Sequence, residues 1–207
     1  MAMIRRKDFA PFNLALSGGE TATHMFSLWA DEYKDKIDWN NIRFFWVDER
    51  CVLPTCPDSN YGHANHLLFK PLCIPADHIH RIKGENEPGT WVVKEFLPLF
   101  NQMPTFDCII LGVGEDSHTA SIFPTTMELL SDSRNYAVSQ QPSTGQYRIT
   151  MTGPLILNGA PLLVPILGTN KEPVIQRLSK GYSPSNDTPA AYILSHAVQA
   201  TIYGLNP

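Results

Sequence analysis

Apolar runs that end abruptly at glycines or charged residues recur along the chain, and each of them predicts a strand. The run at 106–111 (FDCIIL) is the most complete, and Gly112 and Gly114 end it. A continuous apolar run of this kind is typical of a strand buried on both faces of a parallel sheet. Comparable runs predict further strands at 13–17, 42–48, 79–82, 136–139, 148–152, 161–167 and 197–203.

Helical patterns lie between several of these strands, so we expect an α/β fold with a parallel sheet. Helices are expected from the turn after 13–17 to about Tyr33, at 63–69, 90–102 and 155–160, from Lys171 to about Ser179, and at 189–194. The segment 51–62 is rich in proline and small polar residues and is predicted to be a loop. The alternation of RITMT at 148–152 suits a strand at a sheet edge or with a partly exposed face.

Polar side chains are concentrated directly after the strand at 106–111. They are Glu115, Asp116, Ser117, His118, Thr119 and Ser121. Ligands of open α/β sheets bind at the carboxyl ends of the strands, so this segment is the leading candidate for a functional site. An imidazole held in a turn between carboxylates suits general-base chemistry near neutral pH, which makes His118 the candidate base. Asp116 could also be the N-cap of a helix that follows.

Other segments favour an anionic ligand. The turn Ser17–Gly19 joins the first strand to a helix, and N–H groups at such a helix start can bind phosphate or carboxylate, although a plain tight turn has the same pattern. Lys171 opens a predicted helix, where its charge opposes the helix dipole unless an anion lies between them. A solvated surface lysine is the alternative. The strand at 42–48 also ends in charge, with DER at 48–50.

Composition limits the class of protein. A chain of 207 residues that is 43% hydrophobic and 17% charged can bury a large core in one domain, or two at most. A net charge of −4 gives no electrostatic reason to bind nucleic acid or an anionic membrane, although a local pocket could still take a small anion. The sequence has no apolar run of membrane-spanning length and no signal-peptide pattern at its start, so a cytoplasmic location is expected.

The cysteines predict neither a disulfide framework nor a metal centre. They are Cys51, Cys56, Cys73 and Cys108. Their number and irregular spacing suit reduced thiols in a chain of this size. Cys51 and Cys56 have His63 and His66 nearby, but the tight paired spacing of a structural zinc site is missing, and no metal is expected.

Taken together, these segments resemble the 6-phosphogluconolactonase family, within the superfamily that also includes glucosamine-6-phosphate deaminase. The resemblance runs nearly end to end and implies a single domain at 1–207. It is carried by LALSGG at 14–19, WVDER at 46–50, DSNYG at 58–62, GVGEDSHTASIFP at 112–124, RITMT at 148–152 and the step from Gly168 to Lys171. It implies a doubly wound α/β fold of the deaminase and lactonase type, with helices on both faces of a mostly parallel sheet.

The resemblance also implies an activity: hydrolysis of 6-phospho-glucono-1,5-lactone to 6-phosphogluconate in the oxidative pentose phosphate pathway, without a cofactor. His118 would activate water as the general base, with Asp116 beside it, and Asp48 and Arg50 would line the reacting end. The phosphate would be held by Ser17, Gly18, Gly19, Thr21, Arg148 and Lys171. The expected partner is a small sugar-phosphate lactone, and the expected assembly is a monomer or a small homo-oligomer.

Departures from the family pattern keep a second hypothesis open. Glu20 places a carboxylate beside the expected phosphate, which weakens binding unless its side chain points away. Ser117 stands where the family usually has glycine, and a serine is tolerated there only if the residue does not need a positive φ. The chain also begins almost at its first strand, without the family's leading helix. The alternative is a catalytically weak member that binds sugar phosphates or serves as a partner subunit.

The deaminase is the nearest competing enzyme. Its family resemblance would require a motif like HIAFNEP, with a glutamate directly before the proline. Phe123 occupies that place in this chain. The missing carboxylate favours the lactonase over a ring-opening deaminase.

Overall fold

In the computed structural model, one parallel sheet forms the centre of the molecule. The structure describes residues 10–86, 105–168, 171–184 and 187–204, so the helix predicted at 90–102 lies outside the described residues. Within these ranges the sheet has six strands in the order β4-β2-β1-β5-β8-β9, and every neighbouring pair is parallel. The strands are β1 (Phe12–Leu16), β2 (Ile42–Trp46), β4 (Ile79–His80), β5 (Cys108–Ile110), β8 (Leu162–Ile166) and β9 (Ala200–Gly204).

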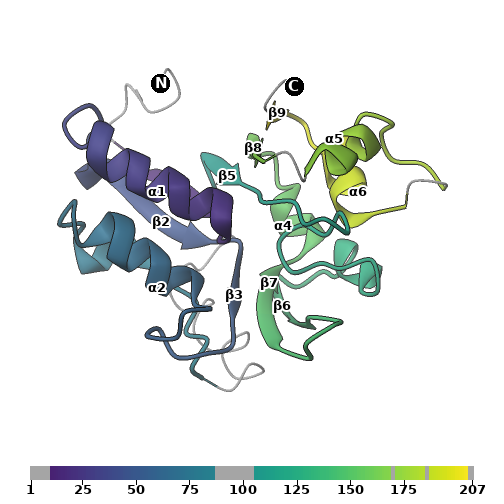
Figure 1. Ribbon diagram of the computed structural model, residues 1–207, viewed down its shortest axis with the longest axis horizontal. Coiled ribbons are helices and arrows are strands. Elements are labelled where there is room, and N and C mark those ends of the chain that lie inside the picture. The colour runs from purple at the N-terminus through teal and green to yellow at the C-terminus, as the bar shows by residue number, and fades with distance from the viewer. Residues whose placement is uncertain (1–9, 87–104, 169–170, 185–186, 205–207) are drawn as a thin grey trace.

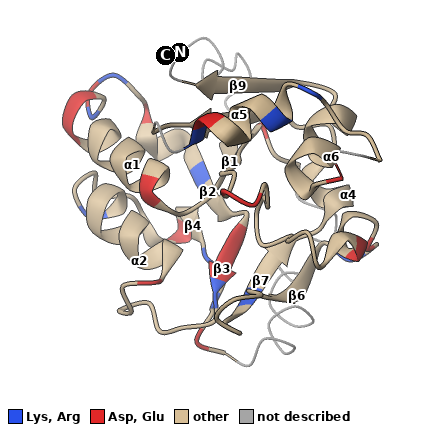
Figure 2. Cartoon of the chain, turned by 45° about the vertical axis from the view of Figure 1, so that its right-hand side comes forward, with Lys and Arg blue, Asp and Glu red and all other residues tan. Residues whose placement is uncertain are grey.

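A second, antiparallel sheet of three strands stands beside the first in the described part of the chain, in the order β3-β7-β6. Its strands are β3 (Asp48–Arg50), β7 (Tyr147–Met151) and β6 (Tyr136–Gln140). Figure 2 shows the acidic residues of β3 next to β7. The strand predicted at 42–48 is confirmed over Ile42–Trp46, but its predicted end is wrong, because the chain leaves the parallel sheet after Trp46 and Asp48 belongs to β3. Val47 is the pivot: its N–H donates to Leu16 O at 2.9 Å, and its carbonyl accepts from Met151 N at 2.8 Å.

The prediction of an edge or partly exposed strand at 148–152 is also wrong. β7 is the middle strand of its sheet, and residues 149–151 are buried. Alternation in RITMT reflects the two faces of a strand that packs on both sides, with Thr150 donating its hydroxyl hydrogen inside the core to Met151 O. The strands predicted at 13–17, 79–82, 106–111, 136–139, 161–167 and 197–203 are present, with shifts at their ends.

Helices flank the parallel sheet. They are α1 (Glu20–Glu32), α2 (Asn60–Ala64) with a π-helical turn, η3 (Asn65–Phe69), α4 (Gly153–Ile156), α5 (Glu172–Leu178) and α6 (Pro189–His196), with 3-10 turns η2 (Trp39–Asn41), η4 (Ala76–His78) and η5 (Met127–Leu130). Figure 1 shows α1 and α2 on one side of the molecule and α4, α5 and α6 on the other. The helix predicted at 155–160 begins earlier, at Gly153, and ends earlier, at Ile156, because the backbone of Leu157, its C-cap, is no longer α-helical. Among the described helices, none has the length and apolar character needed to cross a membrane.

The strand order reverses between β1 and β5. From β1 the chain steps outward to β2 and β4, then returns to β5 and continues outward in the opposite direction to β8 and β9. Right-handed crossovers in opposite directions place helices on opposite faces, so the doubly wound α/β prediction is confirmed. The carboxyl ends of β1 and β5 diverge at this switch point, which is where ligands bind in open α/β sheets.

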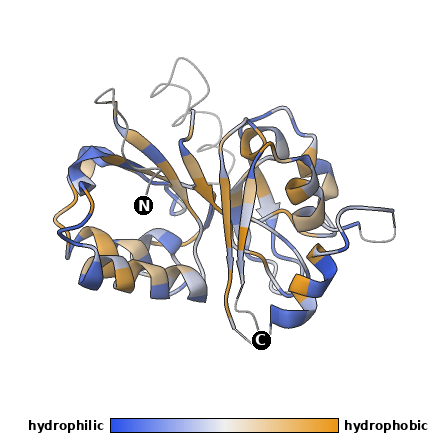
Figure 3. Ribbon diagram, turned by 90° about the horizontal axis from the view of Figure 1, so that it is seen from above, coloured by the Kyte–Doolittle hydropathy of each residue, from blue (hydrophilic) through white to orange (hydrophobic). Residues whose placement is uncertain are grey.

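Large apolar side chains fill the space between sheet and helices, and the central strands are hydrophobic in Figure 3. Phe44, Phe45 and Trp46 of β2 are at most 1% exposed. Trp46 packs edge-on against Phe69 of η3, with ring centroids 5.7 Å apart. This aromatic core fixes the end of β2, and with it the start of the charged strand β3.

Candidate functional site

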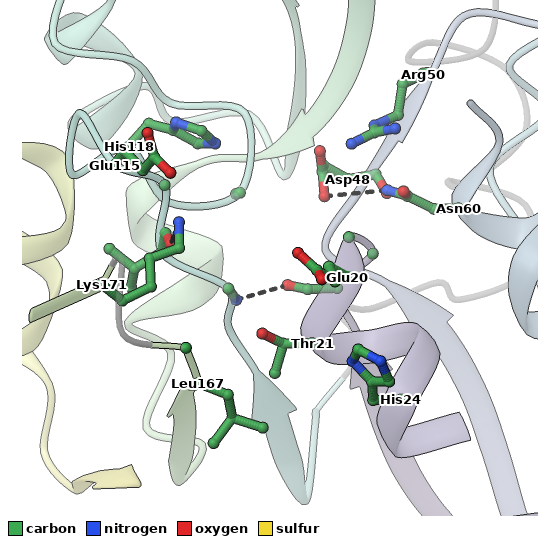
Figure 4. A pocket seen from close by; sticks show the side chains of 18 of the residues that line it. Glu20, Thr21, His24, Asp48, Arg50, Asn60, Glu115, His118, Leu167 and Lys171 are labelled. Atoms are coloured by element: carbon green, nitrogen blue, oxygen red, sulfur yellow. Dashed lines mark hydrogen bonds between the residues drawn. The ribbon is translucent and has the colours of Figure 1, made fainter. Parts of the chain in front are cut away.

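A cavity of about 370 Å³ opens at the switch point, where β1, β3, β5 and β8 end. Its lining includes nine of the ten residues that the sequence predicts for the site; the tenth, Asp116, lies outside the lining. Figure 4 shows His118 and Lys171 on one side of the cavity and Asp48, Arg50 and Asn60 on the other, with Glu20 between them. The fold thus gathers groups from segments that are far apart in the sequence.

His118 is paired with Asp116, which lies behind it. Asp116 Oδ1 is 2.5 Å from His118 Nδ1 and accepts a second hydrogen bond from the backbone N–H of His118 at 3.1 Å. Burial would raise the pKa of Asp116, but the neighbouring imidazole and these hydrogen bonds outweigh burial and hold this pKa below its ordinary value. An ionised Asp116 keeps the proton of a neutral imidazole on Nδ1, so Nε2 is free to accept a proton.

The alternative role of Asp116 as a helix N-cap is wrong. The described residues after Asp116 form turns and the bridges Val113–Thr119 and Thr119–Ile122, not a helix. The Asp116 carboxylate instead bonds to the imidazole and the backbone N–H of His118. This difference follows from the turn closed by Ser117 N and Gly114 O at 2.9 Å, which directs the chain back on itself.

Ser117 adopts a positive φ of 63°, the conformation that the sequence analysis required it to avoid. Its side chain is 0% exposed, and its hydroxyl has no hydrogen-bond partner within the described chain. A left-handed conformation costs a residue other than glycine roughly 1–2 kcal/mol, so serine is strained at this position. The conformation is held in place because Ser117 O accepts a hydrogen bond from Ala190 N, at the start of α6, at 3.1 Å.

Asp48 is held by groups that the sequence analysis did not single out. The carboxylate is buried and accepts a 2.6 Å hydrogen bond from the Ser121 hydroxyl on Oδ2. Asn60 Nδ2 donates to the Asp48 carbonyl at 2.9 Å and lies 3.5 Å from Oδ1. Asn60 stands in DSNYG and Ser121 in the stretch after the central strand, so both lie in quoted motifs, yet only the fold shows that they meet at Asp48.

Glu49 organises the other side of β3. It is 2% exposed, and its carboxylate accepts hydrogen bonds from the N–H groups of Asn60 and Tyr61 at 2.7 Å each, from Arg50 N at 2.8 Å and from the Ser59 hydroxyl at 3.1 Å. Burial raises the pKa of Glu49, although the three N–H donors oppose that rise. Glu49 therefore accepts hydrogen bonds from N–H groups at the start of α2 that have no partner within the helix, and it fixes Asn60 relative to β3.

Two arginines face each other across β3 and β7. Arg50 is directly opposite Arg148 in the antiparallel register. Arg50 Nη1 donates to Asp58 O at 2.7 Å, and Arg148 Nη1 lies 3.9 Å from Asp48 Oδ2. Burial and the charge of Arg50 lower the pKa of Arg148, and the buried Nε atoms of both side chains have no partner among the described residues. Two neighbouring guanidinium groups that both line the cavity favour an anion there.

The glycine turn lines the cavity at the start of α1. Gly18 packs against Asn60, and Gly19 has a φ of 91° directly before α1. Lys171 is the N-cap of α5, and its Nζ donates to Val113 O at 3.2 Å, so the lysine points into the site rather than into bulk solvent. Glu20 does not point away, because its exposed side chain lines the cavity in front of the turn.

Ser17, which is predicted to help hold the phosphate, also has a role inside the protein. Its hydroxyl donates to Ile110 O at 2.9 Å and accepts from Gly112 N at 3.1 Å, which ties β1 to β5. The hydroxyl hydrogen is thereby used inside the protein. A contribution of the Ser17 hydroxyl to anion binding stays a prediction, as do the ligand contacts of the other site residues.

Comparison with known proteins places this site in a family. The family model described as "Glucosamine-6-phosphate isomerases/6-phosphogluconolactonase" matches residues 2–203. The chain belongs to this family. Because the model spans both enzyme names, membership alone does not distinguish them.

Individual relatives of the family carry the lactonase name. A 6-phosphogluconolactonase of Treponema pallidum is 41% identical over 78% of this chain and 70% of its own length. One of Haemophilus influenzae is 38% identical over 88% of this chain and 80% of its own length. A solved structure titled "Crystal Structure of devB protein" is 35% identical, with a TM-score of 0.88 over 98% of this chain and 87% of that chain.

The fold itself is shared more widely. A 6-phosphogluconolactonase of Trypanosoma cruzi and a monomeric glucosamine-6-phosphate deaminase are 23% and 19% identical to this chain. Both have a TM-score of 0.82 over 98% of this chain, and the match covers 86% and 88% of their own chains. These similarities bear on the fold alone. Function must therefore be argued from the groups in the cavity.

All four cysteines are free thiols, in keeping with the prediction of reduced cysteines. Burial raises the pKa of Cys108 to about 12 and that of Cys51 to about 11, so neither is a reactive thiolate at neutral pH. Within the described ranges, no three His, Cys, Asp or Glu side chains come together in a way that could hold a metal ion.

The contact between the glycine turn and Asn60 gives a test of the site's geometry. A Cβ on Gly18 would lie 1.8 Å from Asn60 Oδ1, so Gly18→Ala must displace Asn60 from Asp48. We expect Gly18→Ala to lower the free energy of unfolding by about 1–3 kcal/mol. In an Asn60→Ala background, where the colliding atoms are gone, the same substitution should cost at least about 1 kcal/mol less. Urea denaturation of the four proteins measures this coupling, and strictly additive costs would contradict the packing described.

Proposed function

We propose that this chain is a 6-phosphogluconolactonase, which hydrolyses 6-phospho-glucono-1,5-lactone to 6-phosphogluconate. The observation that carries the proposal is the His118–Asp116 pair, because it presents a free Nε2 to a cavity that also contains two arginines and a lysine. A base at one place and cations at others suit a substrate with an electrophilic carbonyl and a phosphate. The lactonase names of the relatives at 38–41% identity support the same substrate.

In the proposed complex the phosphate is anchored by the N–H groups of the glycine turn and by Thr21 from one side of the cavity, and by Lys171 from the other. Figure 4 shows Thr21 on α1 and Lys171 across the cavity from it, on the side of His118. Backbone N–H groups at a helix start, together with an ammonium group, suit a phosphate dianion. Arg148 is proposed to contribute its guanidinium from β7. Anchoring the phosphate fixes the lactone ring for attack, which removes much of the entropic cost of the reaction.

The chemical step then needs a base and a group that stabilises negative charge. His118 Nε2 takes a proton from water, and the resulting hydroxide adds to the lactone carbonyl carbon. Arg50 is proposed to stabilise the oxyanion that forms on the carbonyl oxygen, while Asp48 orients the neighbouring guanidinium groups. When the ring C–O bond breaks, the proton returns to the leaving ring oxygen. The new carboxylic acid then releases its proton to solvent, so the product carries a carboxylate and the original phosphate.

The proposal extends to the setting of the reaction. Lactone hydrolysis of this kind belongs to the oxidative pentose phosphate pathway, and we place the protein there and in the cytoplasm. The family match and the sugar-phosphate names of its members support this setting. A monomer or small homo-oligomer remains the expected assembly.

A specific observation also favours the second candidate, a weakly catalytic sugar-phosphate binder. Glu20 lines the cavity beside the glycine turn, and Ser117 is strained next to the proposed base. Neither feature removes the base or the cations, so the lactonase remains the better-supported function. The deaminase is disfavoured, since the buried Phe123 provides no carboxylate.

Replacement of the proposed base tests the function. We expect His118→Ala to lower lactone hydrolysis, corrected for the spontaneous rate, by about 10²–10⁴-fold, because general-base catalysis contributes that much. The matched control is His66→Ala, an exposed histidine outside the cavity, which should retain the wild-type rate. Folded wild type without acceleration would refute the enzyme and favour the binder. Ammonia release from glucosamine 6-phosphate would instead identify a deaminase.

Glu20 gives a prediction of opposite sign. Removing its charge with Glu20→Gln should tighten binding of 6-phosphogluconate by roughly three- to tenfold at low salt, since a nearby like charge opposes a phosphate. Glu32→Gln, at the other end of α1, is the control for a general change in charge. Isothermal titration calorimetry at two salt concentrations measures both. Weaker binding in Glu20→Gln alone would mean that this carboxylate accepts hydrogen bonds from the ligand.

A further inference from the structure

Phe123 lies behind the site and is in contact with two of its charged or titratable groups. Its ring centroid is 4.9 Å from that of His118, with 47° between the ring planes. The guanidinium carbon of Arg148 lies over the same ring at 5.8 Å from its centroid. Phe123 is 1% exposed and is not part of the cavity lining, so it does not reach a ligand itself.

The backbone around Phe123 is fixed by a short turn. Phe123 N donates to the Thr126 hydroxyl at 3.0 Å, and Phe123 O accepts from Thr126 N at 2.9 Å. The Phe123 backbone is therefore fixed by hydrogen bonds, and the faces of its ring are fixed by packing. A rigid apolar surface of this kind can transmit a fixed position to the groups that rest on it.

The His118 imidazole has a second close neighbour, Gly114. A Cβ on Gly114 would lie 2.1 Å from His118 Cε1 and 2.2 Å from Nδ1, so the Gly114 backbone touches the Nδ1–Cε1 edge of the ring. Asp116 holds Nδ1 by its hydrogen bond. Of these three neighbours of the imidazole, Phe123 is the one whose ring also contacts the Arg148 guanidinium.

We propose that Phe123 is a positioning residue that sets the placement of the His118 imidazole relative to the Arg148 guanidinium. The inference rests on the proposed function, in which one group is the base and the other holds the phosphate. An aromatic ring suits both contacts, because its face attracts a guanidinium and its flat surface packs against an imidazole. A leucine fills similar space but provides neither surface.

The test compares Phe123→Leu with Phe106→Leu. Phe106 is also buried, at 4% exposed, and its ring centroid lies 5.3 Å from that of Phe45. It does not line the cavity, so Phe106→Leu reproduces the loss of core packing alone. We expect both variants to lower the melting temperature. Only Phe123→Leu should lower kcat, by about tenfold, and raise KM for the lactone, since it loosens the base and the arginine together. Equal kinetics in the two variants would overturn the inference.

A spectroscopic measurement separates this inference from the proposed function. In histidine-selective NMR, the Cε1–H resonance of His118, assigned by its absence in His118→Ala, should move in Phe123→Leu through loss of the ring current and stay in place in Phe106→Leu. An unmoved resonance would overturn the proposal whatever the enzyme activity. If wild type fails to hydrolyse the lactone while the resonance moves, the function is wrong and the positioning contact stands. Phe123→Met serves in the same comparison if Phe123→Leu does not fold.

Discussion

The hydroxyl group of Ser17 joins the two strands between which the site opens, and the arrangement of the cavity depends on it. It donates to Ile110 O and accepts from Gly112 N, at the point where β1 and β5 part. On one side of this tie the chain turns through Gly18 and Gly19 into α1. On the other it continues through Gly112 into the segment that carries His118. One buried side chain thus sets the spacing between the glycine turn and the proposed base.

A second constraint is the departure of the chain from the parallel sheet at Val47. Its backbone bonds to Leu16 and Met151 connect the two sheets, and β3 starts one residue later. Arg50 of β3 consequently lies opposite Arg148 of β7, because β3 does not continue along the parallel sheet. Burial makes each of these charges dependent on its partners, which is why Asp48 and Glu49 accept so many hydrogen bonds.

Much of this architecture is readable in the sequence, because buried parallel strands are continuous apolar runs and functional groups follow them. The bend at Val47 is not readable, since the run IRFFWV has no glycine or proline to mark it. Asp116 was assigned a possible capping role because a polar residue after a strand often precedes a helix. Only the tight turn at Ser117, which reverses the chain, shows that Asp116 is paired with the His118 imidazole instead.

The site residues that the sequence analysis missed act through contacts that sequence spacing does not encode. The Ser121 hydroxyl bonds to the Asp48 carboxylate, although the two residues are 73 positions apart. The Asn60 amide bonds to the Asp48 carbonyl because Glu49 holds the start of α2 next to β3. From the sequence, Phe123 stands out only as the residue that replaces a carboxylate. Its contact with Arg148 depends on the position of β7 in the antiparallel sheet, which no local pattern predicts.

The proposed orientation of the substrate places the phosphate at the glycine turn and Lys171 and the reacting carbon at His118. A crystal structure of the wild-type protein with bound 6-phosphogluconate tests this orientation most directly. We expect the phosphate against the N–H groups of Gly18 and Gly19, with the carboxylate carbon within reach of His118 Nε2. A phosphate bound next to His118, or a ligand outside the cavity, would contradict it.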